Sequence, residues 1–348
     1  MNRLDTIGVD LAKDIFQVVV LSNTGHCRCN RKLSRRKFIE WLYQQKPAVV
    51  VFEACASAHF FCQQAVKAGH RVKQLSPKLV KGYRQGHKTD AKDALAIATA
   101  GQQAHVKTSR PLSVEQQQLK AMYALYKRLS KSRVAKSNEL RALLAEFGLT
   151  CNRGDKALRS KLNEVVEDAD SPLGLELRKI LEDQRSLWLQ MVDQEKDVLK
   201  RLKRQVMQHD QCKRLMALEG IGPLNALGVY LTIGDGAHHK NGREASACIG
   251  LTPKQHSSGG KVKIGTIGRY SGNVELRSSL IQGAQSAINA LLKRGRKTQK
   301  DQWLLNLIDR IGRNKAAVAL ANKNVRTIWS MLKHNSQYKV ELLAQAGV

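Results

Sequence analysis

Two carboxylates near the N-terminus stand where a largely apolar run ends. Asp10 closes the run 6–9, and Glu53 closes the run 48–52. An unpaired carboxylate is costly to bury, so each side chain needs a hydrogen-bond partner, a counter-charge or a metal ion. Taken alone, Asp10 is better explained by a strand end at which a loop begins.

Asp90 and Asp93 form a second acidic pair, in an alanine-rich segment. A helix there places both side chains on one face, because they are three residues apart. Lys88 and Lys92 flank the pair, so a solvent-exposed face with balanced charge explains it equally well by itself. Together with the two strand-end carboxylates, the pair completes an oxygen-only donor set. Such a set suits Mg²⁺ or Mn²⁺, which assist phosphodiester transfer.

A serine-glycine string in the last third of the chain carries a candidate nucleophile. Ser257 and Ser258 directly precede two glycines, which predicts a flexible, cationic loop. The nearby cations are Lys261, Lys263 and Arg269. A hydroxyl among glycines and cations suits attack on a phosphodiester. A loop that only hydrogen-bonds phosphate fits the same residues and is the simpler interpretation.

Gly220 and Gly222 lie between two apolar helical stretches. The pattern resembles a helix-hairpin-helix, in which backbone N–H groups approach a phosphate at a helix N-terminus. An ordinary glycine turn with Pro223 at the first helical position explains it equally well.

The charge of the chain indicates a polyanionic partner. The 348 residues include 59 Lys and Arg against 29 Asp and Glu, a formal charge of +30. Residues 1–110 and 209–348 carry net charges of +12 and +13, whereas 111–208 carry +5. We expect both ends to contact nucleic acid phosphates. Without an apolar run of membrane-spanning length, a signal peptide or paired cysteines, we expect a cytoplasmic protein with reduced thiols.

The elements that must position the carboxylates form an open α/β domain at 1–110. Alternating and apolar patterns predict strands at 6–10, 15–21, 26–33, 48–53 and 71–75 and helices at 34–42, 56–68 and 88–98. We expect the first two strands to pair as a hairpin, and the fourth to be buried in the sheet.

The remaining chain is predicted to be mainly helical. Residues 111–208 contain two long amphipathic stretches, the second following Pro172, which predict a coiled-coil arm. Its apolar stripe has two possible partners, the other helix of the arm or a second chain. Its basic face contacts either nucleic acid or solvent and consists of Lys127, Arg128, Lys131, Arg133 and Lys136. Residues 209–348 are expected to form a mainly α C-terminal domain that carries the serine string.

The N-terminal strings resemble a known family. Gly-Val-Asp-Leu-Ala-Lys at 8–13, Glu53 after a buried strand, and Lys-Thr-Asp-Ala-Lys-Asp-Ala at 88–94 resemble the RuvC-like, ribonuclease-H-fold domain of DEDD transposases of bacterial insertion sequences. The resemblance implies that Asp10, Glu53, Asp90 and Asp93 are catalytic carboxylates that bind Mg²⁺ or Mn²⁺.

The C-terminal strings resemble the transposase domain of the same family. Gly250-Leu251-x-Pro253 is followed by Ser-Gly-Gly-Lys, and residues 306–323 resemble the tail of one subgroup. In that family the serine after the proline is the covalent nucleophile. The resemblance therefore implies Ser258 in that role, with Ser257 as a competitor because this chain has two hydroxyls there.

The resemblance implies a DNA transposase that cuts and rejoins DNA through a phosphoserine intermediate. Its implied partners are donor DNA, target DNA and a structured bridge RNA that pairs with both. It also implies a homo-oligomer, a dimer through the arm and a tetramer in the synaptic complex. The acidic residues and the serine are far apart in sequence, so one site must form by folding back or from two chains.

Two other functions fit part of the pattern. One is a metal-dependent nuclease of the Holliday-junction type, with water as nucleophile and the serine string positioning phosphate. The other is a non-catalytic nucleic-acid-binding protein with structural carboxylates. Activity after replacement of Ser258 or Asp10 distinguishes them.

Overall fold

The computed structural model describes residues 4–168 and 170–340. The chain divides into two compact units. One takes in the chain up to Gln116 together with Ile233–Ala245, and the other takes in Gln117–Thr232 with the chain from Ser246 on. The segment Ile233–Ala245, which lies within the predicted C-terminal domain, thus belongs to the first unit. The predicted domain boundaries at 110 and 208 stay predictions.

The first unit contains a six-stranded sheet in the order β3-β2-β1-β4-β5-β6. Its strands are β1 Thr6–Asp10, β2 Ile15–Leu21, β3 Cys27–Ser34, β4 Val49–Glu53, β5 Arg71–Leu75 and β6 Thr108–Ser109. β1, β2 and β3 pair antiparallel, β4 and β5 run parallel to β1, and β6 is antiparallel to β5. The predicted mixed α/β fold is confirmed.

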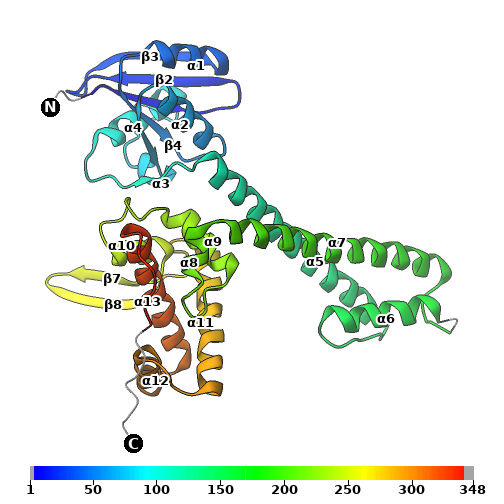
Figure 1. The fold of residues 1–348 in the computed structure, drawn as a ribbon. Coiled ribbons are helices and arrows are strands. Elements are labelled where there is room, and N and C mark those ends of the chain that lie inside the picture. Colours follow the sequence, from blue (N-terminus) through cyan, green and yellow to red (C-terminus); the bar gives the residue numbers. More distant parts are fainter. Residues whose placement is uncertain (1–3, 169, 341–348) are drawn as a thin grey trace, which may run out of the picture. The chain divides into compact units, whose positions relative to one another are not determined.

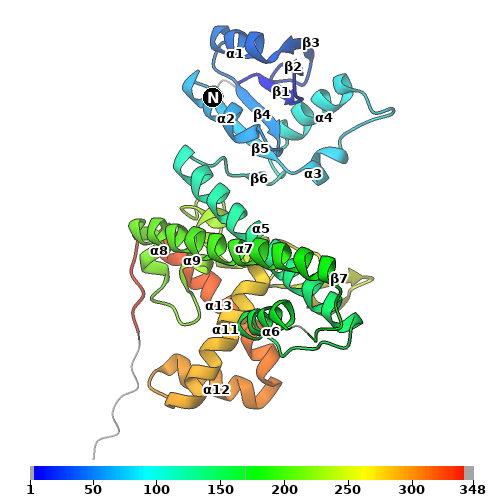
Figure 2. The ribbon, with the colours of Figure 1, turned by 90° about the vertical axis from the view of Figure 1, so that its right-hand side faces the viewer.

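Helices cover both faces of this sheet, as Figure 2 shows. They are α1 Arg35–Gln44, α2 Ala58–Lys67, α3 Pro77–Lys81 and α4 Asp90–Gln102. Phe16 and Val18 pack with α1 and α2 on one face, whereas Val19 and Leu21 pack against α4 on the other. The period-2 alternation of β2 therefore decides which helix each residue contacts.

α4 lies very close to the sheet because β1 has a glycine beneath it. A Cβ added at Gly8 would lie 2.5 Å from the Ala94 carbonyl oxygen and 2.6 Å from Ala98 Cβ. Replacement by alanine therefore has to push the α4 backbone away from β1.

We expect Gly8→Ala to cost about 1–3 kcal/mol of folding free energy. It should also lower DNA cleavage, because α4 carries Asp90 and Asp93. Urea unfolding and a cleavage assay measure both effects. Gly82→Ala is the control, since its added Cβ would meet the Leu79 carbonyl oxygen at 3.4 Å. Equal stabilities of the two variants would contradict the close-packing argument.

The second unit begins with a helical arm. It consists of α5 Val114–Glu146, most of which lies in this unit, α6 Asp155–Glu167 and α7 Leu175–Gln208. Leucines from all three helices surround the buried Trp188. The sequence analysis missed α6 and expected the last helix to begin directly after Pro172, whereas α7 begins at Leu175. Residues 170–174, which are not helical, precede α7.

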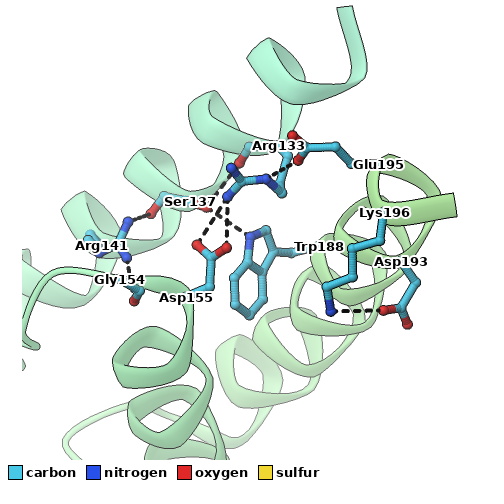
Figure 3. A network of polar contacts seen from close by, with 9 residues as sticks. All are labelled: Arg133, Ser137, Arg141, Gly154, Asp155, Trp188, Asp193, Glu195 and Lys196. Atoms are coloured by element: carbon cyan, nitrogen blue, oxygen red, sulfur yellow. Dashed lines mark hydrogen bonds and ion pairs between the residues drawn. The ribbon is translucent and has the colours of Figure 1, made fainter. Parts of the chain in front are cut away.

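Figure 3 shows the polar network that joins the three arm helices. Arg133 on α5 pairs with Asp155 on α6 at 2.9 Å and with Glu195 on α7. Trp188 Nε1 donates to Ser137 Oγ at 2.8 Å. Arg133 is thus paired within the chain, and Lys127 and Lys136 also have acidic partners. These three cations of the predicted basic face bind carboxylates of the same chain.

The rest of the second unit is mainly helical, as predicted (Figures 1 and 2). Its helices are α8 Asp210–Leu215, α9 Pro223–Ile233, α10 Gly242–Ile249, α11 Val274–Arg294, α12 Gln299–Ile311 and α13 Arg313–Lys333, of which α9 and α10 extend into the segment assigned to the first unit. Strands β7 Pro253–Ser258 and β8 Lys261–Ile267 form a separate antiparallel pair. Within the described residues, no helix is both long and apolar enough to cross a membrane.

Candidate active site

Asp10 and Glu53 lie level with one another at the ends of neighbouring parallel strands. Val9 pairs with Phe52, so the next residue on each strand completes the row. Two residues earlier, Gly8 and Val51 lie beneath α4. Because side chains alternate along a strand, both carboxylates emerge on the α4 face of the sheet.

Asp90 and Asp93 occupy the first turn of α4. Thr89 caps this helix through its side chain, which accepts a hydrogen bond from the Lys92 backbone N–H. The close packing of α4 on Gly8 therefore brings the first turn to the end of the sheet where Asp10 emerges.

The pKa values of Asp10 and Glu53 respond to burial and to neighbouring acidic residues. Burial, then Asp93 and Asp90, raise the pKa of Asp10 above its ordinary value. Burial, then Asp10 and Asp93, raise the pKa of Glu53, while Lys88 and Arg84 oppose this shift. Asp10 therefore experiences the negative charge of Asp90 and Asp93, and Glu53 experiences that of Asp10 and Asp93.

Arg84 is a contact that the sequence analysis missed. Its guanidinium Nη1 lies 3.2 Å from Asp93 Oδ1. Arg84 is in the irregular stretch between α3 and α4, where no periodic pattern marks a functional residue. A cation already contacts one of the four carboxylates, so a metal ion would compete with Arg84 for Asp93.

The donor set fits a hard divalent cation, although the side chains are not gathered around one point. In the described parts of the chain, no three His, Cys, Asp or Glu side chains lie close enough together to hold a metal ion. Burial first, and then neighbouring acidic residues, raise the pKa values of Asp10 and Glu53, and a bound cation would oppose both shifts. The four acidic residues would hold the ion, which would stabilise phosphate oxygens when bound.

The serine string forms a hairpin, which corrects the expectation of a flexible loop. Ser258 ends β7, Lys261 begins β8, and Gly259 and Gly260 form the two-residue turn with φ of +53° and +77°. A two-residue hairpin turn with positive φ at both positions is a type I′ turn, which glycine adopts without strain. Figure 1 shows the pair projecting from the helices of its own unit.

The two serines lie on opposite faces of this hairpin. Ser258 pairs with Lys261, and two residues earlier His256 pairs with Lys263. Partners across an antiparallel pair share a face, so Ser258 lies among cationic side chains. The other face carries Ser257, which pairs with Val262, and Gln255, which pairs with Ile264. Val262 and Ile264 are 60% and 71% exposed.

Ser257 is also engaged locally. Its hydroxyl oxygen accepts a hydrogen bond from Gln255 Nε2 at 3.2 Å. The Ser258 hydroxyl has no side-chain hydrogen bond to another described residue. The register therefore distinguishes two hydroxyls that the sequence left as competitors.

Arg277 on α11 fixes both ends of the hairpin. Its Nη1 donates to the carbonyl oxygens of Gly268 and Ser271, each at 2.7 Å, and to Gly250 at 3.4 Å. Its Nη2 donates to the Arg269 carbonyl oxygen at 2.7 Å. The sequence analysis missed this buried cation, because nothing in a helical pattern marks a side chain that binds a distant loop.

We expect Arg277→Met to loosen the hairpin. Carbonyl oxygens that lose a partner when buried cost about 1–3 kcal/mol. Urea unfolding should show that loss, and amide hydrogen exchange in residues 250–272 should become faster. Arg310→Met is the matched control, because Arg310 is exposed on α12. Unchanged exchange in Arg277→Met would contradict the anchoring role.

The remaining predicted nucleic-acid contacts lie in two places. Gly220 packs against α11, where an added Cβ would meet the Gly283 carbonyl oxygen at 2.5 Å, so packing alone accounts for this glycine. Gly222 precedes α9, and its carbonyl accepts from the Ala226 N–H. Both glycines line a cavity of about 490 Å³. Arg269 follows the hairpin and stacks on the exposed Tyr270 at 5.5 Å.

Two families of known proteins match this chain, one in its N-terminal part and one in its C-terminal part. Residues 7–148 match a transposase family of the DEDD, IS110 type. Residues 212–299 match the transposase IS116/IS110/IS902 family. The chain belongs to the IS110/IS116/IS902 family of transposases. The first match spans the four carboxylates, and the second spans the serine hairpin.

Relatives that match nearly the whole chain are also transposases. A probable family 20 transposase of Pseudomonas aeruginosa is 35% identical over 97% of this chain and 99% of its own length. The transposase for insertion sequence element IS1111A of Coxiella burnetii is 35% identical over 97% of this chain and 92% of its own. A pilin gene-inverting protein of Moraxella lacunata is 23% identical over 80% of this chain and 81% of its own length.

Membership of this family has direct consequences. Transposases act on DNA, which they cut and rejoin, and DEDD-type domains typically depend on divalent metal ions. The sheet and helices of the first unit are consistent with the ribonuclease-H-like fold of such domains.

Proposed function

We propose that this transposase cuts and rejoins DNA through a covalent phosphoserine at Ser258. The observation that carries the proposal is the register of the β7–β8 hairpin. It places the Ser258 hydroxyl opposite Lys261 and on the face of His256 and Lys263. Cations beside the hydroxyl stabilise the charge that develops on a phosphate under attack.

The proposed chemistry conserves the phosphodiester bond energy. The Ser258 oxygen attacks phosphorus and forms a P–O bond, while the bond from phosphorus to one deoxyribose oxygen breaks. The hydroxyl proton leaves and the departing oxygen takes up a proton. In the second step a free DNA hydroxyl attacks the phosphoserine and releases the serine hydroxyl. No nucleotide triphosphate is consumed.

The acidic cluster of Asp10, Glu53, Asp90 and Asp93 is proposed to hold Mg²⁺ or Mn²⁺. Two observations support this, namely the shared row at the strand ends and the raised pKa values of Asp10 and Glu53. Asp10 and Glu53 each need a counter-charge once the scissile phosphate brings further negative charge. A divalent cation supplies it.

The protein is also proposed to work as a homo-oligomer. A groove of about 260 Å³ lies between α5 and α7, and Leu125 and Leu187 at its edge are 60% and 42% exposed. Apolar residues at helical spacing fit a dimerising coiled coil. We infer that dimers join through the arm and that a tetramer forms in the synaptic complex.

A bridge RNA is proposed as the guide that pairs with donor and target DNA. Supporting it is the net charge of +30, which suits contact with the phosphates of RNA as well as DNA. Base pairing would then supply the sequence, while the protein contacts shape and phosphate.

The direct test is a search for the covalent intermediate. Full-length protein is incubated with Mg²⁺, element-end DNA and the candidate bridge RNA, then denatured and digested. Mass spectrometry should find a nucleotide on Ser258. Cleaved DNA without any protein adduct would favour the water-dependent nuclease instead.

A further inference from the structure

Gln17 lies beside the acidic cluster, in the same row of the sheet. It pairs directly with Asp10 across β1 and β2, and on its other side it pairs with Lys32 of β3. Directly paired residues on antiparallel strands share a face, with Cβ atoms about 4.5–5.5 Å apart. Gln17 therefore emerges on the α4 face next to the Asp10 carboxylate.

The side-chain amide of Gln17 is oriented by a chain of hydrogen bonds. Asn30 Nδ2 donates to the carbonyl oxygen of Ala91, which lies between Asp90 and Asp93 in the first turn of α4. A carbonyl only accepts, so the amide nitrogen of Asn30 must face Ala91. Asn30 Oδ1 therefore faces Gln17, whose Nε2 donates to it.

This orientation leaves the other end of the Gln17 amide without a partner. Oε1 is buried and has no hydrogen-bond partner in residues 4–168 and 170–340. Gln17 as a whole is only 6% exposed. An unsatisfied buried acceptor is destabilising by about 1–3 kcal/mol, and turning the amide round would break its bond to Asn30 instead. Oε1 is therefore a buried acceptor that no donor group of the described residues satisfies.

We propose that Gln17 is a positioning residue of the acidic cluster, whose Oε1 accepts a hydrogen bond from a water molecule on the divalent cation held by Asp10. The inference rests on the proposed metal-binding role of the cluster. Mg²⁺ and Mn²⁺ keep several waters when bound by carboxylates, and those waters need acceptors. Through Asn30, the same amide ties the row to the α4 turn that carries Asp90 and Asp93.

Metal binding to the purified full-length protein tests this role without DNA. Isothermal titration with Mn²⁺ should show an affinity about 10-fold or more lower in Gln17→Met, which keeps the side-chain length but removes the acceptor. Gln17→Glu keeps an acceptor oxygen and should bind Mn²⁺ at least as tightly as the wild type. Thermal unfolding checks that both variants are folded.

Gln74→Met is the matched control. Gln74 is a 3% exposed glutamine of the same sheet, and it pairs with Phe52. Phe52 packs in the core opposite to α4, so Gln74 lies on the other face, away from the cluster. Its replacement should leave Mn²⁺ affinity unchanged.

The outcomes separate this inference from the proposed function. Equal Mn²⁺ affinity in Gln17→Met and the wild type, with binding lost in Asp10→Asn, would overturn the role of Gln17 and leave the metal site standing. Unchanged binding in Asp10→Asn, or none in the wild type, would overturn the metal site and Gln17 with it. If Gln17→Met does not fold, weaker binding by Gln17→Glu contradicts the acceptor role.

Discussion

Replacing Ser258 with alanine is expected to abolish both cleavage and joining of element-end DNA, by about 10⁴-fold or more. The hydroxyl is the proposed covalent nucleophile, and no other hydroxyl on its face of the hairpin can replace it at the same position. Ser258 is exposed at a hairpin end, so its replacement should leave the unfolding temperature unchanged. Gel assays of cleaved and joined DNA measure the effect.

Ser257→Ala is the matched control, one residue away on the opposite face. It removes the acceptor of the Gln255 hydrogen bond but leaves the cationic face intact. We expect activity within a few-fold of the wild type. The reverse pattern, with Ser257 essential and Ser258 dispensable, would assign the chemistry to the apolar face and contradict the register argument. Cleavage by both variants would favour the water-dependent nuclease.

Asp10→Asn is expected to have the second largest effect, lowering DNA cleavage by about 10²–10³-fold or more. The same substitution should stabilise the metal-free protein at neutral pH. Burial and the neighbouring aspartates raise the pKa of Asp10, so the ionised carboxylate is less favourable in the folded chain than in the unfolded one. A variant that gains stability and loses activity separates a functional carboxylate from a structural one.

The pH dependence of that stability difference has a defined sign. With a raised pKa, the folded protein binds more protons than the unfolded chain, so Asp10 lowers the free energy of unfolding as pH rises. The loss begins near the ordinary pKa of aspartate, about 4, and is complete above the raised pKa. Urea unfolding should therefore find the two proteins alike at pH 3 and Asp10→Asn more stable at pH 7. Equal stabilities at both values would contradict this account.

Addition of Mg²⁺ provides the complementary measurement. A ligand that binds only the folded chain raises its unfolding temperature. We expect Mg²⁺ to stabilise the wild type and to have little effect on Asp10→Asn. A similar Mg²⁺ effect on both proteins would contradict a metal site at Asp10.

Local patterns in the sequence predicted most elements of the first unit. The apolar and alternating patterns became β1, β2, β4 and β5, and the Ser34 side chain caps α1 at the predicted helix start. These features follow from periodicity and from backbone hydrogen bonding within a few residues. The hairpin β7–β8 was missed because all of β7 and nearly all of β8 are exposed, so neither strand has the apolar alternation by which strands are recognised.

The sequence by itself determined the candidate residues, because the chemical types of the carboxylates, serines and cations are given by it directly. Only the tertiary structure decided which of them meet. The row from Gln17 through Asp10 to Glu53 depends on strand register, and the approach of Asp93 depends on α4 packing against Gly8. Ser258 was separated from Ser257 by the same kind of pairing. Register and packing join residues that are distant in the chain, and no local periodicity encodes them.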